Sequence, residues 1–140
     1  MPSVPFHYID LRTFCYATED EPRVEAAFRH YLPDEYPIER ATGEGHHGDP
    51  IVVLSARVDN ADDVRHVVGK LRELDDLESV LAELDRRVDE DCAFYLKLDK
   101  QAAFRGEVSR GEGILFRAKV EAYPAKKPTA VENAREALAG

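Results

Sequence analysis

The sequence predicts an α+β fold: a two-layer sandwich with helices packed on one face of a mixed or antiparallel sheet. Stretches that alternate apolar and polar residues are interspersed with segments whose apolar residues recur at helical spacing. Their order is β-α-β-β-α-α-β-β-α, without the strict alternation expected of parallel βαβ units. The chain has 140 residues and no internal repeat or linker, so we expect residues 1–140 to form a single domain.

The first half of the chain contains three predicted strands and one helix between them. The first strand spans 6–17, because its side chains alternate between two faces. An acidic cluster with Pro22 in the first turn then begins a helix, which ends at Pro33. Two further strands, 37–45 and 51–58, flank a loop rich in glycine and histidine.

The second half begins with two helices, the first capped by Asn60 and the second following Asp75 and Asp76. A turn this short predicts an antiparallel helical hairpin. Strands are expected at 92–98 and 114–123, and the polar connection between them is expected to contain one helical turn near Gln101–Phe104. A capping box from Thr129 to Glu132 predicts the start of the last helix.

Cysteine use and hydropathy indicate the compartment. Cys15 and Cys92 lie in strand-like stretches without metal-ligand spacing, so we expect buried free thiols in a reducing environment. No apolar run approaches the ~20 residues that span a bilayer, and the amino-terminal residues do not resemble a signal peptide. We therefore expect a cytoplasmic protein without a membrane partner.

The overall charge is strongly negative. The chain has 28 Asp plus Glu against 19 Lys plus Arg, a net charge of −9, and most of its cations are arginine. This composition is expected of a protein kept soluble in concentrated salt, where charges are screened over ~3 Å at 1 M. Net charge is consequently weak evidence against an anionic ligand.

The charge reverses between residues 97 and 127, a segment with eight cations and four carboxylates. A basic island of +4 in an acidic chain is typical of a site for a polyanion such as RNA. Cations would contact phosphates, Gln101 would bind a base or ribose edge, and Phe104 or Tyr123 would stack on unpaired bases. The predicted RNA contacts are Lys97, Lys100, Gln101, Phe104, Arg105, Arg117, Lys119, Tyr123, Lys126 and Lys127. The alternative is a solvated strand face with surface ion pairs.

A second candidate is the loop that contains Gly45, His46, His47 and Gly48. Its glycines could expose N–H groups to a phosphate backbone. Two histidines with Asp49 could bind a metal in a nuclease, but adjacent residues rarely point at one ion, and a flexible hairpin loop is the better account. We find no nucleophile elbow, phosphate-binding glycine fingerprint or zinc motif. We therefore predict no enzyme activity, no metal and no cofactor.

Four segments resemble an archaeal family described as RNA-binding or as a predicted exosome subunit. They are HYIDLRTF with ATED near the start, EGHHGDPI, YLKLDKQAAF, and VEAYPAK. The resemblance covers about residues 6–136 and implies a fold like that of ribosomal protein L-five, RNA binding, and association with the exosome or ribosomal RNA. The acidic composition resembles that of a haloarchaeal member. No catalytic residues follow from it.

The sequence therefore predicts a non-enzymatic RNA-binding protein, with exosome or ribosomal proteins as further partners. The alternative is a protein-interaction module that docks on an RNA-processing or ribosomal complex without reading RNA directly. The oligomeric state stays open.

Overall fold

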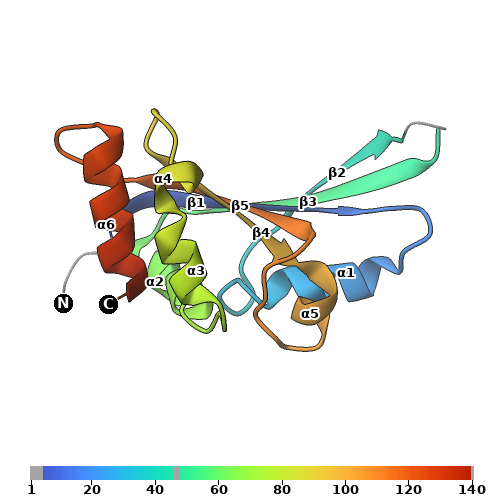
Figure 1. The fold of residues 1–140 in the computed structure, drawn as a ribbon. Coiled ribbons are helices and arrows are strands. Elements are labelled where there is room, and N and C mark those ends of the chain that lie inside the picture. The colour runs from blue at the N-terminus through green and yellow to red at the C-terminus, as the bar shows by residue number, and fades with distance from the viewer. Residues whose placement is uncertain (1–4, 46–47, 140) are drawn as a thin grey trace.

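A five-stranded antiparallel sheet organises the computed structural model, which describes residues 5–45 and 48–139 (Figure 1). The strand order is β2-β3-β1-β5-β4, so the first strand lies in the centre. The strands are β1 (Phe6–Cys15), β2 (Glu39–Glu44), β3 (Pro50–Val58), β4 (Ala93–Asp99) and β5 (Gly113–Val120).

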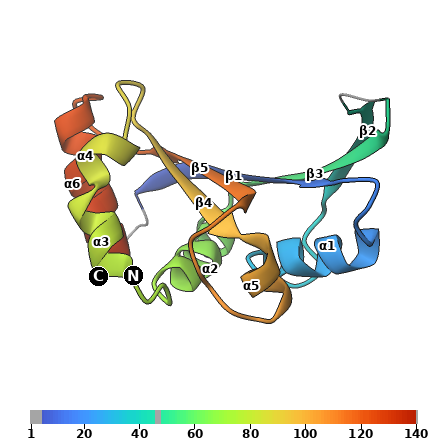
Figure 2. The same ribbon diagram turned by 45° about the vertical axis from the view of Figure 1, so that its right-hand side comes forward.

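Six helices in the described part of the chain leave one face of the sheet open. They are α1 (Glu21–Arg29), α2 (Ala61–Leu71), α3 (Leu77–Ala82), α4 (Leu84–Arg87), α5 (Lys100–Phe104) and α6 (Lys127–Ala139). Figures 1 and 2 show α1, α2, α3 and α5 beneath the sheet, with α4 and α6 against one end. No helix among the described residues crosses the upper face. The predicted α+β class and one-sided helical layer are confirmed.

The alternation along each strand decides which face is buried. On β1, Ile9 and Leu11 are 0% and 1% exposed and pack against the helices, whereas Asp10 and Arg12 point to the opposite face. On β5, Phe116 is buried and meets Phe94 edge-on, with ring centroids 5.7 Å apart. The hydrophobic core therefore lies between the sheet and the helices.

Several element boundaries differ from the prediction. The first helix ends at Arg29, although Tyr31 beyond it is fully buried. The second helix of the predicted hairpin is split at Glu83 into α3 and α4. The last helix begins at Lys127, so Thr129 does not cap it.

The connection after β4 forms a complete short helix, because the Asp99 side chain accepts a hydrogen bond from the Ala102 amide (2.9 Å) and caps α5. The element order is therefore β-α-β-β-α-α-α-β-α-β-α. Other local predictions hold: Asn60 caps α2 through the Asp62 amide (2.9 Å), and Cys15 and Cys92 are buried free cysteines. None of the described helices has the length and apolarity needed to span a membrane.

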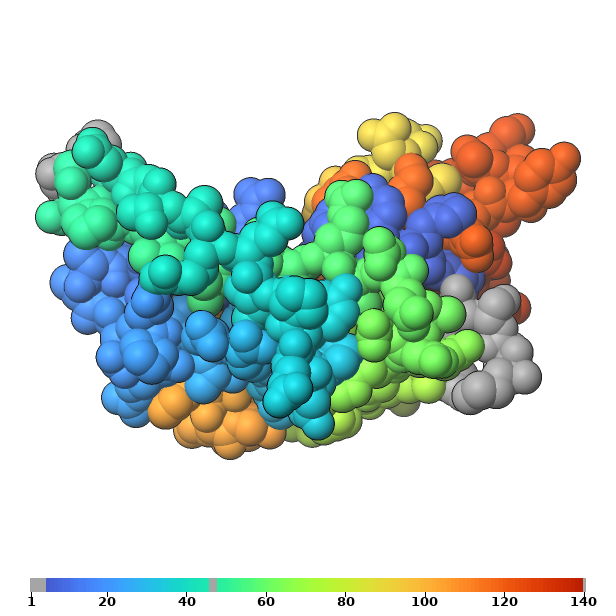
Figure 3. Space-filling view, turned by 180° about the vertical axis from the view of Figure 1, so that it is seen from behind, coloured from blue at the N-terminus to red at the C-terminus, as the bar shows by residue number. Residues whose placement is uncertain are grey.

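The upper surface is concave. The β2–β3 hairpin rises at one end of the sheet, and the α4–β4 connection with α6 rises at the other (Figures 1 and 2). Seen from behind in Figure 3, the surface dips between these two ends. The open side of the sheet thus forms the floor of a broad hollow.

Candidate nucleic-acid interface

We define the open face as the helix-free side of β1, β3, β4 and β5. It carries Tyr8, Asp10, Arg12, Phe14, Val53, Ser55, Arg57, Tyr95, Lys97, Leu115, Arg117 and Lys119. Five of these side chains are cations and one is a carboxylate, a net charge of +4 in a chain of −9. The raised strand β2 adds Glu39 opposite Ser55. The open face is therefore a basic surface on an acidic protein.

One row across the sheet places Asp10 between two arginines. The strand register pairs Asp10 with Arg57 on β3 and with Arg117 on β5. Arg57 donates to both carboxylate oxygens, at 2.8 and 2.9 Å, and Arg117 lies 3.9 Å away. The hydrogen bond to Asp10 raises the pKa of Arg57 above its ordinary value. One carboxylate thus orients two guanidinium groups and leaves a surplus positive charge.

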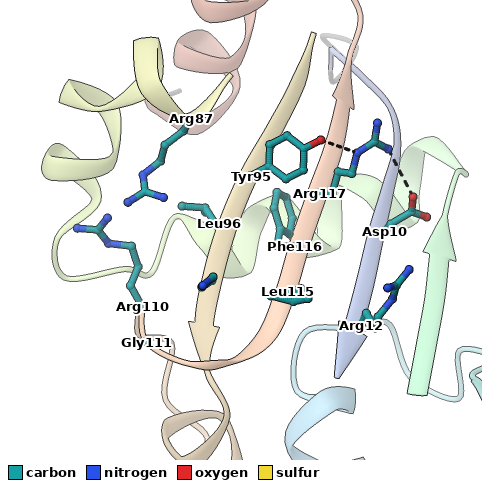
Figure 4. Close-up of a pocket in the computed structure, with 11 residues that line it drawn as sticks. Asp10, Arg12, Arg87, Tyr95, Leu96, Arg110, Gly111, Leu115, Phe116 and Arg117 are labelled. Atoms are coloured by element: carbon teal, nitrogen blue, oxygen red, sulfur yellow. Dashed lines mark hydrogen bonds and ion pairs between the residues drawn. The ribbon is translucent and has the colours of Figure 1, made fainter. Parts of the chain in front are cut away.

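The same two arginines hold tyrosine rings in place. The Arg57 guanidinium lies over the Tyr8 ring, 4.0 Å from its centroid. Arg117 donates to the hydroxyl of Tyr95 at 3.1 Å (Figure 4) and to that of Tyr8 at 3.3 Å. These hydrogen bonds raise the pKa of Arg117. The Tyr95 ring is 42% exposed. The rings are therefore oriented before any ligand arrives.

The neighbouring row offers cations that are less engaged. Arg12 on β1 and Lys97 on β4 flank Leu115 on β5 through direct register pairs. Arg12 is exposed and makes no hydrogen bond or ion pair with any described residue. The Lys97 side chain is 60% exposed, and its ammonium lies 3.9 Å from Glu112. These two side chains are available to an anion.

A pocket of about 570 Å³ lies over these two rows (Figure 4). It reaches from Asp10 and Arg12 across β5 to β4, and its outer rim includes Arg87 and Arg110. Both rim arginines are held by Glu83, at 2.8 Å from Arg87 and 2.9 Å from Arg110. Arg110 also pairs with Asp76 at 2.6 Å. The rim arginines are thus engaged in ion pairs, whereas Arg12 and Lys97 stand inside the rim and are less engaged.

A family model described as RNA binding matches residues 8–120, which include all five strands except the first two residues of β1. The chain belongs to this RNA-binding family. The resemblance to an archaeal RNA-binding family, drawn from four sequence segments, is thereby confirmed.

Proteins similar to this chain match it over nearly its whole length. RNA-binding protein PAB1135 of Pyrococcus abyssi is 37% identical, over 96% of this chain and 94% of that protein. The crystal structure of protein AF2318 from Archaeoglobus fulgidus matches with a TM-score of 0.84 and 28% identity, over 94% of this chain and 99% of that one. Mth689, a DUF54 protein from Methanothermobacter thermautotrophicus, matches with a TM-score of 0.81 and 41% identity, over 95% and 98%. The fold described above is therefore a family fold.

The residues of the predicted basic island lie in several different parts of the structure. Lys97, Arg117 and Lys119 lie on the open face, as the strand alternation predicts. The Lys119 ammonium donates to the Asp91 carbonyl. Arg110, which also belongs to the island, is held in the ion pairs of the pocket rim.

Lys100 was predicted as a phosphate contact, and the structure corrects this. The residue is only 9% exposed, and its ammonium pairs with Glu19 at 2.9 Å and donates to the Phe14 carbonyl at 2.9 Å. Because the chain turns into α5 directly after β4, Lys100 points under the sheet instead of continuing the alternation. Its charge is satisfied inside the protein.

Gln101 and Phe104 belong to α5, which lies on the helical side of the sheet (Figure 1), and Arg105 directly follows this helix. Arg23 of α1 covers the Phe104 ring at 4.4 Å, and Arg105 pairs with Glu107 at 3.2 Å. These three predicted contacts are therefore not brought together with the open face.

Tyr123, Lys126 and Lys127 lie where the chain passes from β5 into α6. Tyr123 is 98% exposed, and Lys126 is exposed as well. Figure 1 shows this connection at the α6 end of the sheet.

The glycines of the predicted backbone-contact loop use their amides within the hairpin turn. The Gly45 amide donates to the Asp49 carbonyl (2.6 Å), and the Gly48 amide donates to the Gly45 carbonyl (3.0 Å). These N–H groups are therefore not free for phosphate. His46 and His47 lie outside the described residues. Within residues 5–45 and 48–139, no group of three or more His, Cys, Asp or Glu side chains could hold a metal ion.

Sequence reasoning missed four residues of the interface, namely Tyr8, Arg12, Arg57 and Tyr95. Alternation in the first strand already separated Tyr8 and Arg12 from the core-facing side chains. The missing information was the strand order, which places β1 between β3 and β5 and so brings distant basic residues together.

Proposed function

We propose that this protein binds RNA through the open face and catalyses no reaction. One observation carries the proposal: five cations surround oriented tyrosine rings on a single sheet face of a chain whose net charge is −9. Membership of the RNA-binding family supports it. The name of the relative PAB1135, an RNA-binding protein, agrees.

The cations divide into two roles. Arg57 and Arg117 are anchored to Asp10 and hold the tyrosine rings. Arg12, Lys97 and Lys119 project from the sheet and donate to phosphate oxygens, an interaction that needs no particular base. Tyr123, Lys126 and Lys127 extend the contact toward the end of the sheet.

The test is a triple substitution of the projecting cations, Arg12→Ala, Lys97→Ala and Lys119→Ala. Each lost phosphate contact removes about 0.7 from the slope of log affinity against log salt for a single strand. We expect the slope to fall by about 2 and the affinity at 0.1 M KCl to fall at least tenfold. Fluorescence anisotropy with a labelled random-sequence RNA 12-mer measures both.

A matched control removes three cations from the helical side, Arg23→Ala, Lys70→Ala and Arg105→Ala, with the same change in net charge. We expect the control to bind nearly as wild type does, because its cations lie away from the open face. Equal losses in both variants would show a non-specific charge effect. Retained RNA binding in the open-face variant would refute the proposal that the RNA-binding site lies on the open face.

We also propose, from the family resemblance, that the protein acts in association with the exosome or with ribosomal RNA. The likeness to ribosomal protein L-five and the haloarchaeal character stay predictions of that resemblance. Copurification of exosome or ribosomal components with tagged protein, before and after ribonuclease treatment, tests the association. If these components are lost after ribonuclease treatment, RNA bridges them to the protein.

A second candidate function is protein docking, and the edge strand β2 favours it. Within the described part of the chain, β2 pairs with β3 alone at the end of the sheet order, and its six residues are exposed. An open edge can accept a strand from another protein. Partners retained after ribonuclease treatment, but lost on Thr42→Pro substitution in β2, would support docking.

A further inference from the structure

We propose that the pocket over β1, β5 and β4 binds an unpaired nucleotide, so that the protein selects single-stranded over double-stranded RNA. This inference rests on the proposed function, and it adds the class of RNA and the place where a base sits.

The pocket has the size and lining of a site for a small organic group. Its volume of about 570 Å³ falls within the range of about 300–1,000 Å³ common for such sites. Its walls combine two apolar side chains that are exposed to solvent, Tyr95 (42%) and Leu115 (37%), with the cations Arg12 and Lys97. A nucleotide has the same combination, an apolar base face joined to an anionic phosphate.

Tyr95 is the stacking surface. The ring stands on the open face of β4, and the hydrogen bond from Arg117 fixes its hydroxyl end at 3.1 Å (Figure 4). An aromatic ring oriented on a sheet stacks on a base with little loss of side-chain entropy, since the ring is already ordered. Leu115 lies on the adjacent strand, in the next cross-strand row, and extends the apolar floor.

The two less engaged cations stand where a phosphate would follow the base. Arg12 and Lys97 flank Leu115 on opposite sides, two strand spacings apart, or about 10 Å. The remaining rim arginines are neutralised by Glu83 and Asp76. The phosphate is therefore bound inside the pocket beside the apolar floor, and not at its rim.

A duplex does not satisfy this arrangement. In a double helix the base faces are stacked on one another, so a ring on a protein surface cannot reach them. A duplex could contact Lys97 and Arg12 only through its backbone, and it would leave the Tyr95 ring unused. The recess thus favours a strand whose bases can turn outward.

The experiment compares one fluorescein-labelled mixed-sequence RNA 12-mer, free and annealed to its complement, by anisotropy at 0.1 M KCl. Tyr95→Thr removes the ring but keeps a β-branched residue suited to a strand. We expect wild type to prefer the single strand, and Tyr95→Thr to weaken single-strand binding about tenfold while duplex binding stays unchanged. Tyr95→Phe keeps the ring and should remain within about threefold of wild type.

The control is Phe104→Ala on α5, an aromatic of nearly equal exposure (40%) on the helical side. It should not change RNA binding. Photo-cross-linking of 4-thiouridine RNA to wild type gives an independent readout, and the adduct should map to the peptide that contains Tyr95.

Four outcomes overturn the inference. Equal affinity for duplex and single strand, or equal losses in Tyr95→Thr and Tyr95→Phe, would refute base stacking while RNA binding by the open face still stands. A cross-link on α5 would do the same. No binding of either RNA by wild type would overturn the proposed function together with this inference.

Discussion

Lys97 and Lys100 stand three residues apart and have opposite roles. Lys97 projects from the open face with a side chain 60% exposed, whereas Lys100 is buried with its ammonium against Glu19. The alternation that places Lys97 correctly ends at Asp99, where the strand becomes a helix. A run of basic residues predicts a charged surface only as long as its secondary structure continues.

We predict that Lys100→Met lowers the free energy of unfolding by about 1–3 kcal/mol at pH 7 without changing RNA binding, since the Glu19 carboxylate and Phe14 carbonyl lose a charged donor. Burial acts to raise the pKa of Glu19, but hydrogen bonds from Lys100 and the Tyr16 amide outweigh it and lower the pKa below the ordinary 4.5. A lowered carboxylate pKa stabilises the fold above the unfolded-state value, and this stabilisation is lost as pH falls through the folded-state value.

The difference in the free energy of unfolding between wild type and Lys100→Met should therefore become smaller below about pH 4.5. Urea denaturation at pH 7, 5 and 3.5 measures it. A difference in unfolding free energy that stays constant with pH would indicate a packing effect and no contribution from the Lys100–Glu19 ion pair.

At the scale of single elements, the start of β5 depends on a glycine. Gly113 has φ 119°, in the region that favours glycine, and a Cβ built there would lie 2.5 Å from the Cβ of Lys100. Its carbonyl also accepts the Thr13 hydroxyl at 2.6 Å. This position sets where β5 enters the sheet, and hence which of its side chains reach the open face.

Gly113→Ala should destabilise the protein by about 1–3 kcal/mol, because the substitution adds both backbone strain and a steric clash. Thermal unfolding followed by circular dichroism measures the loss. Gly69→Ala is the control, since Gly69 lies within α2 with nothing near its added Cβ, and it should stabilise by up to about 1 kcal/mol. Similar effects at both positions would contradict the role assigned to Gly113.

Element boundaries were harder to predict than element types. Strand alternation and the Asn60 cap depend on neighbouring residues and were read correctly. At the break, the Glu83 carboxylate is held by Arg87 in the next turn and also by Arg110, which follows α5 in the sequence. Such long-range contacts leave no local pattern in the sequence.

At the scale of the whole molecule, the sequence predicted the fold class and the one-sided helical layer, but only part of the site. Seven of the twelve open-face residues come from β1 and β3, which are distant from the basic island along the chain. Charge composition indicated a candidate binding segment, and only the strand order brought the residues of the open face together. Counting charge along the chain therefore underestimates a site that a sheet builds across it.

Net charge also predicts a response to salt. Because like charges repel in an acidic protein, added KCl should raise the melting temperature by several degrees between 0.1 and 2 M. RNA affinity should fall over the same range. Glu73→Gln, Asp75→Asn and Glu78→Gln together reduce the net charge to about −6 and should flatten the melting-temperature curve. A melting temperature that is independent of KCl in wild type would contradict the importance of charge repulsion.

The separation of charge between the two sides makes the molecule an electric dipole. With +4 on the open face, the remainder of the chain carries −13. The negative charge on the helical side repels a polyanion. The electric field of the protein therefore favours orientations in which the open face of the sheet points toward the polyanion. Diffusional encounters in which the open face points toward the RNA are thus favoured before contact. A protein of negative net charge can therefore still associate with RNA rapidly in one orientation.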